Sequence, residues 1–198
     1  METAQRLGYR TNPNLPLLDP IQSIRPKEEL LDRILALYTC VSSAFDFPKE
    51  TALSWLRQEG LYEELSPFER EYLKSNDESE RATFAWQVEA LWALTWVSGH
   101  HDSLDFSDSC ADDFVYIFPR IRPEDTTRKF RNVASPRRIE DVVEMLDLSY
   151  CLDWAVMDAR LRGAPEPGEV PGLVVQERRR ALEWVAGEDP WDEITLDT

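Results

Sequence analysis

Apolar residues fall on every face of the segment from Phe84 to Ser98, FAWQVEALWALTWVS, if it is wound as a helix. Only Gln87, Glu89 and Thr95 place clearly polar side chains inside the run. A helix that is apolar all round has to be covered by protein on all sides. Three of the seven tryptophans lie here, and each can bury roughly 150–250 Å². The pattern therefore predicts a buried central helix over about residues 82–98.

Segments on both sides of this helix have apolar residues at the spacing of amphipathic helices. Pro26 precedes a first turn, and Gly60 and Gly163 follow last turns. Ser66 and Glu69 have the spacing of a capping box, in which each residue bonds the backbone of the other. The predicted helices cover about residues 27–43, 48–60, 67–75, 111–118, 136–163 and 173–186.

The N-terminal residues 1–26 contain four prolines and little periodicity, which predicts an extended arm. Apolar side chains in the arm indicate that it packs on the rest of the protein: Leu15, Leu17, Leu18, Ile21 and Ile24. Residues 27–198 are expected to form a single all-helical domain with a short tail from Trp191. The predicted fold is thus an all-α, single-domain multi-helix bundle around the central helix.

The chain is strongly acidic, because 38 acidic side chains outnumber 22 basic ones and leave a formal charge of −16. Such a surface repels the phosphates of nucleic acids and of anionic membranes, so neither is expected as a partner. The central segment is also too short and too polar to span a bilayer, which needs about 20 apolar residues. Charge reverses only between Arg120 and Arg138, where seven basic residues meet two acidic ones.

Cys40, Cys110 and Cys151 are widely spaced, and no CxxC pair suggests a metal or redox site. No apolar run of signal-peptide length precedes them. We expect buried free thiols in a cytoplasmic protein rather than a catalytic cysteine, because no histidine singles one of them out. Glycine-rich phosphate loops, GxSxG and HExxH are also missing from the sequence. The sequence therefore predicts no catalytic residue, metal site or cofactor.

Six segments spread over most of the chain share their residues with one known family. They are the arm ending NLPLL, RPKEELLDRILAL, WLRQEGLYEELSPFEREYL, FAWQVEALWALTWVSG, MLDLSYCLDWAVMDARLRG and VVQERRRALEWVAGEDPWDEITLDT. Together they resemble the uncharacterised bacterial DUF4272 family. The resemblance implies an all-helical bacterial protein with no established activity. His100, His101 and the basic residues 128–138 depart from the family pattern.

Glu89 is the first candidate for chemistry, because it stands alone among apolar residues. A carboxylate buried without a partner costs several kcal/mol, so either a cation pairs with it or its pKa rises. We expect an arginine of the last helix, Arg178 ahead of Arg179, to form an ion pair that fixes how this helix docks. The alternative is a general acid or base in a pocket. Trp86 and Glu177 belong to the same candidate network.

A second candidate group joins the long helix to the tail, and it consists of Asp153, Trp154, Asp158, Arg160, Trp191, Asp192 and Asp197. If the tail folds back so that Asp192 and Asp197 approach Asp158, their oxygens could bind Mg²⁺ or Ca²⁺. We favour the alternative that Trp191 fills an apolar groove while the aspartates are solvated or cap helix ends. No carboxylate spacing here matches a known calcium loop.

His100 and His101 follow the central helix directly. Adjacent helical residues point about 100° apart and cannot share a metal ion without unwinding. The sequence also holds no third histidine. An interaction with the negative C-terminal end of the helix dipole is therefore the preferred interpretation.

Two functions from different classes follow. The first is a helical binding module without catalysis that binds a basic protein partner, since the surface is acidic and tryptophan is abundant. The second is a small-ligand or metal-dependent hydrolase-like enzyme with a pocket lined by Trp154, Asp158, Arg178 and Trp191.

Overall fold

The computed structural model describes residues 2–75 and 77–197, and this part of the chain forms helices and no strand. The helices are α1 (Glu2–Arg6), α2 (Lys27–Ala44), α3 (Lys49–Gln58), α4 (Pro67–Lys74), α5 (Arg81–Trp86), α6 (Val88–Val97), α7 (Arg128–Val133), α8 (Ile139–Leu161) and α9 (Gly172–Ala186). Three 3-10 turns join them: η1 (Tyr62–Glu64), η2 (Phe114–Ile117) and η3 (Trp191–Glu193). The predicted all-α fold is confirmed.

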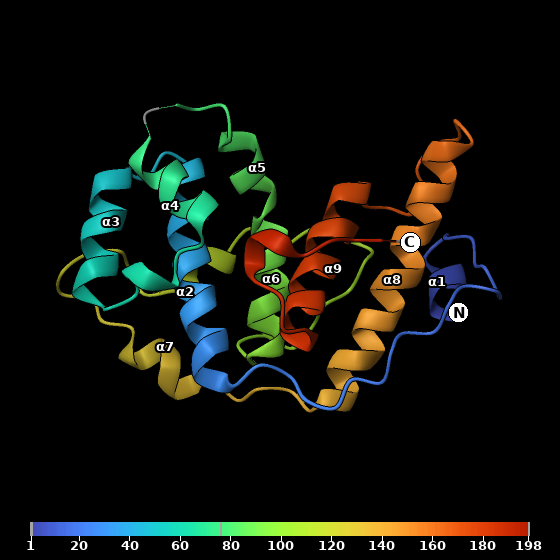
Figure 1. Cartoon of the computed structure of the whole chain (residues 1–198), viewed down its shortest axis with the longest axis horizontal. Helices are drawn as coiled ribbons and strands as arrows, with labels where there is room; N and C mark the ends of the chain where they lie inside the picture. Colours follow the sequence, from blue (N-terminus) through green and yellow to red (C-terminus); the bar gives the residue numbers. More distant parts are fainter. Residues whose placement is uncertain (1, 76, 198) are drawn as a thin grey trace.

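Helices α6 and α9 lie side by side in the middle of the molecule, with α2, α3 and α4 on one side and α8 and α1 on the other (Figure 1). The larger hydrophobic core joins α2, α3 and α6 to the C-terminal half of α9. A smaller core lies between α1, α8 and the N-terminal half of α9, where Val174 and Val175 are buried. Helix α9 therefore contributes to both cores.

The predicted central helix is divided at Gln87 into α5 and α6. In α6 every residue except Val88 and Trp92 is buried, as expected for a helix that is apolar all round. The prediction is wrong for α5, because this helix buries only Phe84 and leaves Trp86 38% exposed. Among the described residues, no helix combines the length and the apolar content that a membrane span requires.

The other helix boundaries lie close to those predicted, and the capping box is present. The backbone N–H of Glu69 donates to Ser66 Oγ at 3.2 Å, and the Ser66 N–H donates to Glu69 Oε2 at 2.9 Å. Residues 111–118 form only the 3-10 turn η2. Helix α7 was not predicted, because it buries a single side chain, Phe130, and has no apolar stripe.

The N-terminal arm is held at both of its ends. Residues 2–6 form α1 rather than the expected extended chain, because Ala4 packs into the smaller core. At the other end, Arg25 donates from its backbone N–H to Val185 O at 3.0 Å, and its guanidinium lies over the Trp184 ring at 4.3 Å. Met1 and Thr198, which belong to the predicted arm and tail, lie outside the described residues.

Candidate functional site

Glu89 and Arg178 form a buried ion pair between α6 and α9. Arg178 donates from Nε and Nη2 to Glu89 Oε2 at 2.9 and 2.7 Å. Both side chains are almost fully excluded from solvent. The pairing predicted from the isolated acid in an apolar helix is confirmed, with Arg178 as the partner.

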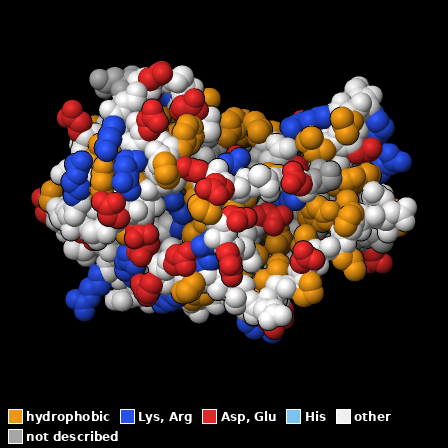
Figure 2. Space-filling model, in the orientation of Figure 1, with side chains coloured by type: hydrophobic (Ala, Val, Ile, Leu, Met, Phe, Trp, Pro, Cys, Tyr) orange, Lys and Arg blue, Asp and Glu red, His pale blue; other side chains and the backbone are white. Residues whose placement is uncertain are grey.

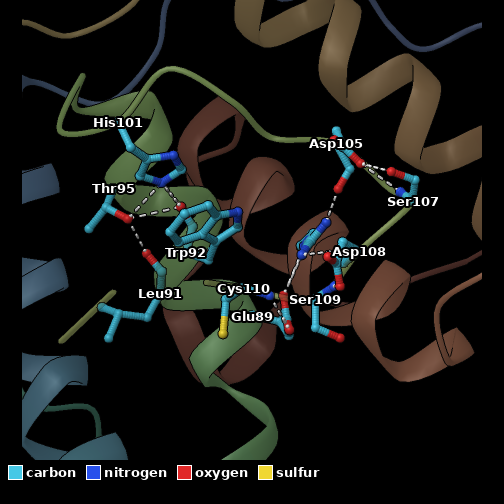
Figure 3. Close-up of polar contacts among 11 residues, drawn as sticks. Glu89, Leu91, Trp92, Thr95, His101, Asp105, Ser107, Asp108, Ser109 and Cys110 are labelled. Carbon is cyan, nitrogen blue, oxygen red and sulfur yellow. Dashed lines mark hydrogen bonds and ion pairs between the residues drawn. The ribbon is translucent and has the colours of Figure 1, made fainter. Parts of the chain in front are cut away.

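The same pair also fastens the segment 105–110 to the two helices, as Figure 3 shows around Glu89. Arg178 donates from Nη1 to Asp105 O and from Nη2 to Asp108 O, the latter at 2.9 Å. The other carboxylate oxygen of Glu89 accepts from the Cys110 N–H at 3.0 Å. Because protein groups occupy both oxygens of Glu89, the geometry favours a structural cross-link over acid–base chemistry.

A second buried pair lies one residue further along α9. Arg179 donates from Nη1 to Asp153 Oδ2 at 2.6 Å, and Gln176 donates to the other oxygen of Asp153 at 3.1 Å. Arg179 also lies over the Tyr150 ring at 4.8 Å. This pairing was not predicted, although Asp153 stands in an apolar helical stretch just as Glu89 does, and the same argument could have found it.

The residues proposed to line a pocket around Asp158 do not converge. Asp158 binds Arg162 at 2.8 Å and Arg10 at 3.1 Å, and these partners hold its pKa below the usual value, with the Arg162 bond as the main cause. Arg160 turns instead to Glu166 at 2.7 Å. Trp154 packs half-buried against the smaller core.

The C-terminal tail docks on α4 and α9. Trp191 is buried and packs edge-on against Trp184, with ring centroids 5.9 Å apart. Asp192 Oδ2 accepts from the Phe68 N–H at 3.0 Å and so caps the start of α4. The favoured interpretation of a tryptophan plug and a helix cap is confirmed. The metal alternative required Asp192 and Asp197 near Asp158, but Asp192 caps α4 and Asp158 pairs with Arg10 and Arg162, and the described residues hold no cluster of three metal-binding side chains.

The side chains of two remaining members of the candidate network take no part in the two buried ion pairs. Asp197 is exposed and contributes only its backbone carbonyl, which accepts from Arg179 Nη2 at 2.9 Å. Glu177 is buried, and desolvation raises the pKa of its carboxyl group. Arg180 Nε lies 3.8 Å away from Glu177 Oε2, too far for a hydrogen bond.

The two histidines stack on aromatic rings at the end of α6. The His101 ring lies 3.7 Å from the Trp92 ring (Figure 3), and the His100 ring lies 3.9 Å from the Phe130 ring. His101 Nε2 lies within hydrogen-bond distance of the Trp92 carbonyl oxygen, and His100 Nε2 lies within hydrogen-bond distance of the Phe130 carbonyl oxygen. Burial lowers the pKa of both rings. His101 contacts α6 at the Trp92 carbonyl and the Thr95 hydroxyl, and His100 contacts Ser98 at the C-terminal end of α6. The interaction with the helix dipole stays a prediction.

These histidines should make stability fall in mildly acidic solution. Their pKa values are lower in the folded than in the unfolded chain, where histidine titrates near about 6.5. The unfolded chain thus binds more protons as the pH falls below about 6.5, and the stabilisation present above this pH is lost. We expect the free energy of unfolding, measured with urea between about pH 7.5 and 5.5, to fall less steeply in the double variant His100→Gln/His101→Gln. Equal slopes in the two proteins would contradict this.

Two of the basic residues in the stretch 120–138 bind acidic side chains or backbone carbonyl groups of the same protein. Arg131 bonds Glu28 at 3.2 Å and also Asp32, both on α2. Arg137 donates to the carbonyl oxygens of Trp96, His101 and Asp102. These two arginines attach the segment around α7 to α2 and α6.

The three cysteines are free thiols in the described structure. Cys40 is buried, whereas Cys110 and Cys151 are half-buried rather than fully buried as expected. Burial raises the pKa of all three thiols, and for Cys110, where the Glu89 charge adds to it, the pKa reaches about 12. Protonated thiols are weak nucleophiles, so the geometry gives no support to a catalytic cysteine.

A groove of about 540 Å³ runs beside the N-terminal half of α8, and we call it the α8 groove. Its lining is Thr3, Trp96, Asp102, Ser103, Leu104, Arg137, Asp141, Glu144, Met145, Asp147, Leu148 and Cys151. The lining contains four carboxylates and one guanidinium, that of Arg137. This guanidinium already donates hydrogen bonds to backbone carbonyl groups. Asp141 pairs with Arg138 at 2.8 Å. Within the described part of the chain, Asp102, Glu144 and Asp147 have no ion-pair partner.

Comparison with known protein families identifies the chain. The family model described as "Domain of unknown function (DUF4272)" matches residues 1–194. The chain belongs to the DUF4272 family. Neither the curated proteins nor the solved structures include a match to it.

In this DUF4272 protein, the residues that carry the family resemblance largely hold the helices together. Glu89 and Arg178 join α6 to α9, Arg179 joins α9 to α8, and Trp191 and Asp192 attach the tail to α9 and α4. The α8 groove takes Trp96, Met145, Asp147, Leu148 and Cys151 from the same resembling segments. Sequence reasoning missed the groove because its walls come from four separate segments.

Proposed function

We propose that this DUF4272 protein is a cytoplasmic binding module that recognises a basic protein partner without catalysis. The observation that carries the proposal is the α8 groove, in which Asp102, Glu144 and Asp147 lack cationic partners among the described residues. Carboxylates at the edge of a groove accept charge-assisted hydrogen bonds from lysine or arginine. Free thiols at all three cysteines support a reducing compartment.

The groove suits a long cationic side chain rather than a free cation. Met145, Leu148 and Trp96 form apolar walls along which the methylene stem of a lysine or arginine can pack. Its charged end then reaches the carboxylates of Glu144 and Asp147, both of which are exposed on α8. One exposed ion pair contributes only about 0–1 kcal/mol, so a basic segment with several cations is the fitting ligand.

The charge of the whole protein supports the same partner. A net charge of −16 attracts a basic protein from a distance and speeds association. Figure 2 shows acidic side chains spread across the middle of one face, with lysine and arginine mainly toward its ends. The structure gives less support to the enzyme alternative, because Asp158, Arg178 and Trp191 bind separate partners instead of lining one pocket.

Affinity capture from a lysate of the native host tests the proposal. We expect the wild-type protein to capture a basic protein, and the double variant Glu144→Gln/Asp147→Asn to capture at least about tenfold less, because two unpaired carboxylates are lost. Capture should also weaken as the ionic strength rises from about 0.05 to 0.3 M. Quantitative mass spectrometry of the bound fraction measures both effects.

Glu169→Gln/Glu193→Gln is the matched control, since it removes the same charge from exposed residues outside the α8 groove. It should capture as much of the basic protein as the wild type. Equal loss in both double variants would mean that total charge alone attracts the partner, and capture that is insensitive to both would contradict the proposal.

A further inference from the structure

A second groove, which we call the η2 groove, lies between α2, the start of α6 and the segment carrying η2. It encloses about 420 Å³ and is lined by Tyr38, Val41, Ser42, Phe45, Val88, Leu91, Cys110, Ala111, Asp112, Phe114, Val115 and Phe118. Asp112 is the one charged residue in this lining. The groove is thus mainly apolar, in contrast to the α8 groove.

Large apolar side chains stand open to solvent at the rim. Phe45 is 62% exposed and Val115 is 51% exposed, and both belong to the lining of the groove. Tyr116, next to Val115 in the sequence, is 84% exposed and lines the neighbouring hollow. Single exposed apolar residues are common on protein surfaces, but several gathered around one groove are typical of interaction sites. Aromatic and aliphatic residues at the centre of such a surface contribute most of the binding free energy.

The walls of the groove are fixed before any partner binds. Tyr38 stacks on Phe118 with centroids 4.2 Å apart, and Phe114 packs edge-on against both Phe118 and Trp92. The backbone of Cys110, where the η2 segment begins, is held by Glu89 of the buried ion pair. A preformed groove loses little conformational entropy on binding, which favours a well-defined occupant.

Charge decides what this occupant can be. A second copy of the chain would bring a further charge of −16 toward the first, and an anionic lipid would meet exposed Asp112 and Asp113 at the groove. Neither aspartate has an ion-pair partner among the described residues. Arg81 donates to Ala44 O beside Phe45, but it is paired with Asp46. Arg120 and Lys129 line a separate hollow beyond Phe118. A segment with apolar side chains and a cationic flank satisfies both the groove and its acidic edge.

We propose that the η2 groove binds an amphipathic helix of a protein partner, with large apolar side chains between Phe45 and Val115 and lysine or arginine beside Asp112 and Asp113. A helix places its side chains at positions i, i+3, i+4 and i+7 on one face, so it can present several large apolar side chains to the apolar lining at once. This site is separate from the α8 groove and does not depend on the function proposed there.

Selection from a displayed library of helical peptides tests the inference on the full-length protein. The library is randomised on one helix face and at both flanks. Enriched peptides should carry large apolar residues at i and i+4 with lysine or arginine at one flank. Their affinity should fall at least about tenfold for the double variant Phe45→Ser/Val115→Ser, because the apolar contacts at the rim are lost. Asp112→Asn/Asp113→Asn should weaken the same peptides and reduce the dependence of binding on salt.

Leu17→Ser/Leu161→Ser is the matched control, since it removes two exposed leucines that lie outside the groove. It should bind the selected peptides as the wild type does, and thermal unfolding should show that all variants remain folded. Failure to enrich any peptide, or enriched peptides that bind Phe45→Ser/Val115→Ser unchanged, would overturn the inference. Peptides lost only in Glu144→Gln/Asp147→Asn would also overturn it, while supporting the α8 groove.

Discussion

Glu89→Ala is expected to lower the free energy of unfolding by about 3–5 kcal/mol, the usual cost of removing one partner from a buried ion pair. The variant leaves the Arg178 guanidinium without its carboxylate in a place that water does not reach. It also removes the acceptor for the Cys110 N–H, which frees the start of the η2 segment. Since single domains are stable by only about 5–15 kcal/mol, the loss is a large part of the total.

A double variant separates the charge of this pair from its volume. Glu89→Leu/Arg178→Met replaces both ions by apolar side chains, so no unpaired charge stays buried. Urea unfolding should find it more stable than Glu89→Ala, because replacing both members of a buried pair is often close to neutral. The carbonyl groups of Asp105 and Asp108 then lose their donor, which limits the recovery.

Wild-type stability in Glu89→Ala would contradict the structural role of the pair. Glu144→Gln serves as the surface control, since Glu144 is exposed and should change stability by no more than about 0.5 kcal/mol.

Trp191→Ala should cost about 3–5 kcal/mol, as is usual for truncating a buried tryptophan. The indole packs against Trp184 and lies beneath the Arg33 guanidinium at 5.2 Å, and Arg33 is itself in a buried pair with Glu69. Loss of the ring therefore opens a cavity beside the buried Arg33–Glu69 ion pair. The tail should also detach from α4. Limited proteolysis would detect this as faster cleavage within the residues that follow Gly187.

Two further substitutions define what the tryptophan contributes. Trp191→Phe should keep most of the stability, because the buried indole N–H has no hydrogen-bond acceptor among the described residues. Trp86→Ala should cost much less than Trp191→Ala, since Trp86 is partly exposed on α5. Equal losses in Trp86→Ala and Trp191→Ala would contradict the proposed role of the tail.

The sequence predicted those features that depend on one segment and its composition. A single acidic residue in an apolar helix is expected to pair with a cation, and Glu89 forms an ion pair with Arg178. Ser66 and Glu69 required a helix start, and α4 begins there. Such features are local or follow from the cost of burying one charge.

Features built from distant segments could not be predicted in this way. The two grooves each combine residues from several elements, and the exposure of Phe45 and Val115 has no counterpart in the sequence pattern. The division at Gln87 was also missed, because the apolar pattern runs on through it. Here tertiary packing decides which of the available tryptophans is covered: Trp96 and Trp191 are buried, and Trp86 is not.

The two consecutive arginines of α9 also tie together parts of the molecule that could otherwise unfold apart. Arg178 reaches across to α6 and Arg179 to α8, so the helix holds its register against both cores at once. Neighbouring helical residues differ by about 100° in direction, and any slip or rotation of α9 breaks both pairs together. The larger and the smaller core should therefore melt as one cooperative unit, with α9 as the shared element.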